Sequence, residues 1–111
     1  MFDLSKFKER FIEEAFGLIN QLEGSLLDQE DQLENKENVQ QIFRVLHTLK
    51  GTGAMYGYVH VGDLVHDLES IFDLIREGKQ EFTTAIFEIT LKIVDHLRNL
   101  LNDELLVDDT N

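Results

Sequence analysis

The sequence predicts an all-α protein, an antiparallel up-down four-helix bundle, and three observations support this fold class. The chain contains no proline, which favours long, uninterrupted helices. Apolar residues recur at steps of three and four in four separate segments, the spacing of amphipathic helices. The polar connections between the segments are short, as in antiparallel bundles. With 111 residues the chain is long enough for one core, so we expect a single domain over residues 1–111.

The first two predicted helices cover residues 4–28 and 38–56, with a polar connection between them. The first has an apolar stripe that includes Phe11, Ala15 and Leu22. For the second, Asn38 with Gln41 three residues later forms a capping-box pattern that predicts the start. Its predicted buried residues are Val39, Ile42, Phe43, Leu46 and Leu49.

The last two predicted helices cover residues 61–77 and 83–104. Gly78 is the expected C-terminal stop of the third helix, and Thr83 the expected N-cap of the fourth. Residues 105–111 are expected to be frayed or to begin a linker. The fourth helix is expected to bury Ile86, Ile89, Ile93, Leu97, Leu100 and Leu101.

Composition excludes several classes of function. The absence of cysteine rules out disulfides and thiolate metal sites and fits a cytoplasmic location. No apolar run approaches the ~20 residues of a membrane span. The formal net charge of −12 makes nucleic acid an unfavourable partner, because phosphate backbones require clustered Lys and Arg.

Residues 47–57 carry the strongest functional pattern in the chain. His47, Lys50 and Gly51 are at positions i, i+3 and i+4 and therefore share one helix face. His47 is at the edge of the apolar stripe, roughly 90° from its centre, while Lys50 projects into the stripe. A histidine, a nearby cation and a position without a side chain are what a protein needs to accept a phosphoryl group held by another protein.

A nucleophilic imidazole also needs a partner at Nδ1 that fixes its tautomer, so that Nε2 can attack. Glu69 and His66 are an i, i+3 pair on the polar flank of the third helix, which can face His47 if helices two and three pack antiparallel. We therefore expect Glu69 to accept the Nδ1 proton and His66 to be a second member of the network. His60 and His96 are interpreted as structural or incidental.

Two motifs, His47-Thr-Leu-Lys50-Gly51 and Met55-Tyr-Gly57-Tyr, resemble the histidine phosphotransfer (HPt) domain. Together with the later Glu69, they are most similar to the amino-terminal phosphotransfer domain of CheA-type chemotaxis histidine kinases. The resemblance implies that His47 accepts a phosphoryl group from ATP through a separate ATP-binding kinase domain and passes it to an aspartate of a response-regulator receiver domain. It also implies supporting roles for Lys50 and Glu69, room for the partner at Gly51, and a helix turn at Gly57.

The resemblance implies a phosphocarrier in two-component signalling, not a kinase that acts alone, since no ATP-binding motif is present. No cofactor or metal is expected in this chain; ATP and Mg²⁺ would bind the partner kinase domain. The chain could be part of a longer kinase or a free-standing relay protein that accepts from a receiver. Two other classes are a non-catalytic helical adaptor and a metal-binding bundle. Di-iron bundles require Glu-x-x-His pairs, whereas Arg44 and Asp63 stand three residues before His47 and His66.

Overall fold

The computed structural model describes residues 4–28, 35–56 and 58–109. These residues form four helices: α1 (Leu4–Asp28), α2 (Lys36–Tyr56), α3 (Val59–Arg76) and α4 (Thr84–Asp109). The predicted all-α four-helix fold is confirmed. None of these helices, over the part of the chain described, has both the length and the apolar character that a membrane span requires.

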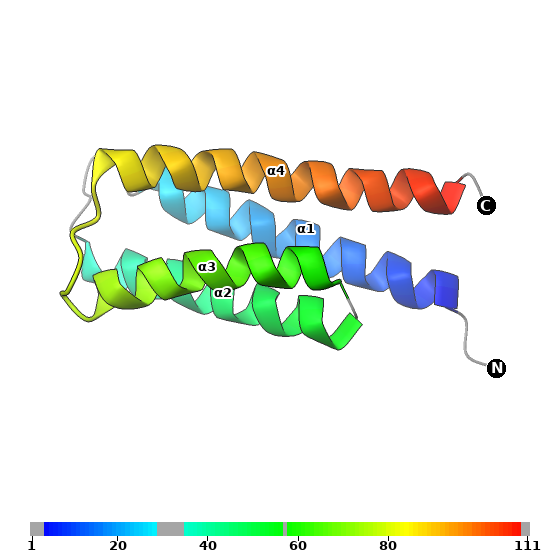
Figure 1. Cartoon of the computed structure of the whole chain (residues 1–111), viewed down its shortest axis with the longest axis horizontal. Coiled ribbons are helices and arrows are strands. Elements are labelled where there is room, and N and C mark those ends of the chain that lie inside the picture. The colour runs from blue at the N-terminus through cyan, green and yellow to red at the C-terminus, as the bar shows by residue number, and fades with distance from the viewer. Residues whose placement is uncertain (1–3, 29–34, 57, 110–111) are drawn as a thin grey trace.

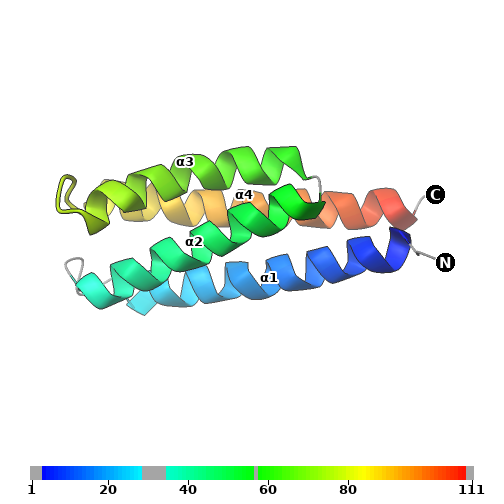
Figure 2. The ribbon, with the colours of Figure 1, turned by 90° about the horizontal axis from the view of Figure 1, so that it is seen from below.

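The helices run alternately up and down along a bundle of 48 × 20 × 18 Å. Figures 1 and 2 show α1 and α4 extending beyond the turn between α2 and α3, with both chain termini at that end. The pairing of α2 with α3 is the most extensive, and that of α3 with α4 is the weakest. The α2–α3 pair therefore forms one side of the bundle as a closely packed unit.

One hydrophobic core runs the length of the bundle. Every helix contributes side chains that are less than 2% exposed, and they occur at the predicted three-and-four spacing. The largest of them are Phe11, Ile19, Leu22, Leu26, Ile42, Leu46, Leu49, Leu68, Phe72, Leu97 and Leu101.

The prediction for the core of α4 was partly wrong. Ile89 is 53% exposed, whereas Phe87, Thr90 and Val94 are buried together with Leu97. Because threonine is not counted among the apolar residues, the apolar pattern did not include Thr90 in the buried stripe of α4. Its hydroxyl donates a 2.7 Å hydrogen bond to the Ile86 carbonyl within the helix. This bond offsets the free-energy cost of burying the polar hydroxyl of Thr90.

The predicted starts of α2 and α3 were two residues too late. Helix α2 begins at Lys36 because Asn35 is the cap: its side-chain oxygen accepts a hydrogen bond from the Asn38 amide at 3.2 Å. Asn38 instead donates from Nδ2 to the Ser25 carbonyl at 2.6 Å and so ties α2 to α1. Helix α3 begins at Val59 after Tyr58, which makes no side-chain capping bond.

The predicted end of α4 was also wrong. The helix continues past residue 104 to Asp109, so residues 105–109 are helical and not a frayed tail. The sequence has no glycine or proline there to stop the helix. Thr83 does cap its start as predicted, since its hydroxyl accepts a hydrogen bond from the Ile86 amide at 3.2 Å.

Gly78 ends α3 as predicted, and its backbone explains why. Its φ of +77° is in the left-handed region, where a Cβ causes strain. The Gly78 amide donates to the Ile75 carbonyl at 3.1 Å and the Lys79 amide to the Leu74 carbonyl at 2.9 Å. This pair of bonds is the Schellman arrangement that satisfies the last carbonyls of a helix.

The same substitution should therefore have opposite effects at two glycines. We expect Gly78→Ala to lower the free energy of unfolding by about 1 kcal/mol, because alanine tolerates positive φ poorly. Gly17→Ala, in the exposed middle of α1 with open space around its position, should raise it by about 1 kcal/mol. Urea denaturation of the two variants checks both signs, and a stabilising Gly78→Ala would contradict the assigned cap.

Candidate functional site

Two glycines on α2 have different surroundings, and together they define the site surface. A Cβ on Gly53 would lie 3.6 Å from both the Gly62 amide nitrogen and the Tyr58 carbonyl oxygen, so the backbones of α2 and α3 approach closely here. A Cβ on Gly51 would meet nothing within 4 Å. Gly53 thus serves the approach of the neighbouring helix, and Gly51 leaves an open patch on the surface one turn beyond His47.

The turn between α2 and α3 is held against α1 by aromatic stacking. The rings of Tyr58 and Phe11 lie face to face, with centroids 4.1 Å apart and an interplanar angle of 6°. Phe11 is fully buried in the core. This contact helps to hold the start of α3 against α1 and so contributes to which residues of α3 face His47.

His47, Lys50 and Glu69 come together across the α2–α3 interface as predicted. His47 Nδ1 lies 3.1 Å from Glu69 Oε1, and Lys50 Nζ lies 2.8 Å from Glu69 Oε2. The side chain of Glu69 is only 13% exposed, whereas that of His47 is 64% exposed. A largely buried carboxylate of α3 therefore holds two side chains of α2, one on each oxygen.

The charge of Glu69 decides which nitrogen of His47 carries a proton. Burial would raise the pKa of Glu69, but hydrogen bonds and charge from Lys50 and His47 outweigh it, so the pKa is lowered below its usual 4.5. Glu69 is then ionised at neutral pH and can only accept hydrogen bonds. His47 Nδ1 must be the donor, which leaves the lone pair of a neutral ring on Nε2.

Phe43 and Arg76 lie next to the His47–Lys50–Glu69 group, and the sequence did not predict these contacts. Phe43, predicted only as a core residue, is half-buried, and its ring centroid lies 6.1 Å from that of His47 with 21° between the planes. The Arg76 guanidinium carbon lies 4.2 Å from the centroid of the same Phe43 ring. The spacing of four residues between Phe43 and His47 was the available signal for the first contact.

The other predicted site residues are less clearly engaged. His66 is exposed, and its Nδ1 lies 3.7 Å from Asp67 Oδ1; no contact links it to His47, Lys50 or Glu69 within the described ranges. Gly57 lies outside the described residues. His60 and His96 are exposed and line a shallow depression between α3 and α4.

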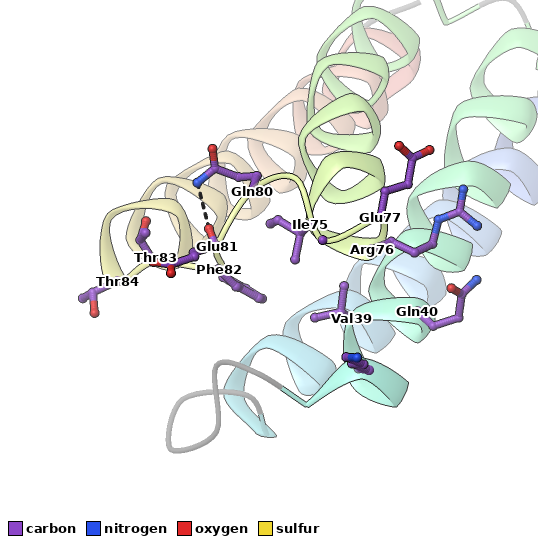
Figure 3. A pocket seen from close by; sticks show the side chains of 12 residues that line it. Val39, Gln40, Ile75, Arg76, Glu77, Gln80, Glu81, Phe82, Thr83 and Thr84 are labelled. Atoms are coloured by element: carbon purple, nitrogen blue, oxygen red, sulfur yellow. Dashed lines mark hydrogen bonds between the residues drawn. The ribbon is translucent and has the colours of Figure 1, made fainter.

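The site is exposed to solvent at His47 and at Gly51. A pocket of about 650 Å³ lies between the start of α2, the end of α3 and the α3–α4 connection, and its lining includes Arg76 but neither His47 nor Glu69 (Figure 3). In the part of the chain that the structure describes, no three His, Asp or Glu side chains are placed to hold a metal ion. An exposed histidine on a helix suits a phosphoryl group that is brought by another protein.

The sequence matches the Hpt domain family over residues 6–105, which is most of the chain. The chain belongs to the Hpt domain family. Among solved structures it is similar to the CheA phosphotransferase domain from Thermotoga maritima, with a TM-score of 0.87 and 27% identity over 90% of this chain and 95% of that one. A computationally redesigned four-helix bundle, 19% identical with a TM-score of 0.85, shares the fold.

Curated relatives of this Hpt domain include chemotaxis proteins and a sensor histidine kinase. It is 34% identical over 91 residues to the chemotaxis protein CheA of Borreliella burgdorferi, and 32% identical over 101 residues to the sensor histidine kinase CheAY of Helicobacter pylori. These matches cover 82% and 91% of this chain but only 10% and 13% of the relatives. The chain is thus homologous to the phosphotransfer part of much longer proteins.

The lowered pKa of Glu69 predicts a pH dependence of stability. Because the pKa is lower in the folded state, Glu69 contributes stability that is present above about pH 4.5 and is lost as the pH falls through the folded value. We expect Glu69→Gln to lower the free energy of unfolding of the Hpt domain by about 1 kcal/mol at pH 7. This difference should shrink below pH 4.5, as measured by urea denaturation at several pH values.

A double-mutant cycle provides the control for this prediction. In a Lys50→Met background the carboxylate lacks its main counter-charge, so the effect of Glu69→Gln at pH 7 should be smaller than in the wild type. An effect of Glu69→Gln that is the same at pH 3 and pH 7 would show that the ionised carboxylate does not stabilise the fold.

Proposed function

We propose that this Hpt domain is a phosphoryl carrier in chemotaxis two-component signalling and that His47 is the phosphoacceptor. The observation that carries the proposal is the hydrogen bond from His47 Nδ1 to Glu69, which directs the reactive lone pair to Nε2 on an exposed ring. The similarity to CheA phosphotransfer domains over most of the chain supports the same conclusion.

The first step is attack of His47 Nε2 on the γ-phosphorus of ATP held by a kinase domain. The nitrogen–phosphorus bond forms, the bond from phosphorus to the β,γ-bridging oxygen breaks, and ADP leaves. Nδ1 keeps its proton, so the phosphorylated ring gains positive charge. Glu69 stabilises that positive charge from 3.1 Å. Lys50 neutralises the carboxylate of Glu69 and so reduces its repulsion of the new, negatively charged phosphoryl group.

The second step returns the site to its starting state. An aspartate oxygen of a receiver domain attacks the phosphorus, the nitrogen–phosphorus bond breaks, and the lone pair returns to Nε2. No proton has to leave or enter His47 in either direction, because Nδ1–H remains bound to Glu69 throughout. This fits a carrier, which must give up its phosphoryl group as readily as it takes it.

The partners follow from this chemistry. We propose that an ATP-binding histidine-kinase domain supplies the phosphoryl group, with ATP and Mg²⁺ bound on that domain, and that a response-regulator receiver accepts it in the cytoplasm. This chain spans 10% and 13% of two curated relatives, and the Helicobacter pylori relative is named a sensor histidine kinase. The open patch at Gly51 is where either partner would approach.

His47→Gln should abolish phosphorylation and leave the fold intact. Since His47 is largely exposed, we expect its replacement to change the free energy of unfolding by less than about 1 kcal/mol. Incubation with a CheA-type kinase domain and γ-labelled ATP should label the wild type with an acid-labile, alkali-stable phosphate and should not label the variant. His96→Gln, which changes an exposed histidine of α4, is the matched control and should be labelled like the wild type.

Label on His47→Gln equal to that on the wild type would overturn the assignment. If no CheA-type kinase domain labels the wild type but a phosphorylated receiver does, the domain is a relay that accepts from receivers. If neither labels it, the helical adaptor is the better description.

Gly51→Leu should impair phosphoryl transfer without harming the fold. A Cβ at position 51 would meet nothing within 4 Å, so we expect a leucine there to extend into the space that a partner needs. We expect the variant to be at least as stable as the wild type, because leucine favours helix by nearly 1 kcal/mol over glycine. The rate of labelling should fall by about tenfold or more, while Gly17→Leu, at an equally open glycine of α1, should leave the rate unchanged. A Gly51→Leu domain that transfers at the wild-type rate would show that no partner approaches there.

A further inference from the structure

The hydrogen bond to Glu69 alone does not fix the imidazole of His47. It restrains one ring atom, Nδ1, and leaves the ring plane free to swing about that point. With 64% of the side chain exposed, few other contacts are available to restrain it. The direction of the Nε2 lone pair, and hence in-line attack, depends on the ring plane.

Phe43 is placed to supply the second restraint. Side chains of a helix lean toward its N-terminus, so His47 leans over the turn that carries Phe43, four residues earlier. The two rings are 6.1 Å apart and only 21° from parallel, within the range of offset stacking. Phe43 is itself half-buried and packed against the core, so its ring offers a fixed wall to an otherwise mobile imidazole.

The Phe43 ring is in turn restrained from α3. The Arg76 guanidinium lies over it at 4.2 Å from the centroid, a cation–π contact. Arg76 is oriented by Asp73 one turn earlier, with Nε donating to Oδ1 at 3.1 Å. Figure 3 shows Arg76 extending from the end of α3 toward α2. A row of contacts thus runs from Asp73 through Arg76 and Phe43 to His47, on the side of the imidazole away from Lys50.

We propose that Phe43, held by Arg76, is a positioning residue that sets the ring plane of His47 and keeps Nδ1 directed at Glu69. This proposal rests on the assignment of His47 as the phosphoacceptor. Neither Phe43 nor Arg76 touches the phosphoryl group in this account; both act through the imidazole. A residue of this kind should affect the rate of the chemical step at saturating concentrations of the domain, and not the binding of the kinase.

The test compares Phe43→Leu with three other variants. Leucine keeps the apolar contact with the core but removes the aromatic ring. Phe43→Tyr keeps the ring and should retain the function of the wild type. Phe16→Leu changes another half-buried phenylalanine of the core, on α1, and controls for loss of stability. Arg76→Met removes the cation and should have a smaller effect in the same direction as Phe43→Leu.

Two measurements are made on each variant of the chain. ¹⁵N NMR of the His47 ring near neutral pH reports which nitrogen carries the proton and needs no kinase. Steady-state labelling by a CheA-type kinase domain, with this chain as the varied substrate, separates kcat from KM. We expect Phe43→Leu to decrease the population with the proton on Nδ1 and to lower kcat by about tenfold, with KM within about twofold of the wild type. Phe43→Tyr and Phe16→Leu should match the wild type in both.

The outcomes separate this proposal from the proposed function. A Phe43→Leu domain with unchanged His47 nitrogen signals and unchanged kcat overturns the positioning role, even if its stability is lower. An increase in KM alone would make Phe43 a docking contact and would also overturn it. An Arg76→Met domain that matches the wild type in both measurements removes Arg76 from the account. If no kinase labels even the wild type, the proposed function fails, while the NMR measurement still decides whether Phe43 orients the ring.

Discussion

The carboxylate of Glu69 is the interaction on which the rest of the site depends. It is the one group of α3 that holds both His47 and Lys50 of α2, at 3.1 and 2.8 Å, and it does so from a largely buried position. Its negative charge at neutral pH makes it an obligatory acceptor, and an Nδ1 directed at it must therefore carry the proton, with the lone pair on Nε2. Without it, an exposed histidine on a helix would have neither a fixed tautomer nor a counter-charge for the phosphorylated ring.

The packing of the bundle holds α2 and α3 in one register, and the site depends on this register. Gly53 permits the close approach of their backbones, and the stacking of Tyr58 on Phe11 fixes the start of α3 against the core of α1. The left-handed Gly78 ends α3 just beyond Arg76, so the guanidinium over Phe43 belongs to the last turn of that helix. The backbone conformations at Gly53 and Gly78 therefore affect where α3 lies relative to His47.

The sequence predicted the parts of this arrangement that follow from periodicity and local chemistry. The four helices, the cap at Thr83 and the stop at Gly78 were predicted correctly. Glu69 was expected to be the partner of His47 because the polar i, i+3 pair on α3 can face α2 in an antiparallel packing, and the two side chains do meet. The errors have physical reasons. Asn35 and Asn38 are equally good caps by residue type; in the structure Asn35 makes the capping bond, while the side chain of Asn38 donates to Ser25 of another helix. The burial of Thr90 in place of Ile89 depends on a hydroxyl bond within the helix that no apolar pattern records.

The contacts of Phe43 and Arg76 could not be predicted, for a different reason. Phe43 lies in the apolar stripe of α2, so pattern alone makes it a core residue, and nothing in the sequence places residue 76 of one helix over residue 43 of another. Such a contact depends on the relative translation of two helices, which is set by packing across the whole interface. His66 shows the converse: its spacing from Glu69 suited the network, but its imidazole lies next to Asp67 on the exposed side of α3.

The most direct test of this account is to identify the nitrogen that carries the phosphoryl group. ¹⁵N and ³¹P NMR of the phosphorylated, ¹⁵N-histidine-labelled domain gives this assignment without any mutation. We expect phosphorus on Nε2 of His47, with a proton retained on Nδ1 and protected by its bond to Glu69. Phosphorus on Nδ1 would contradict it, because the contact of Nδ1 with Glu69 could not then survive in the phosphorylated state. Phosphorus on any histidine other than His47 would contradict the assignment of His47 as the phosphoacceptor.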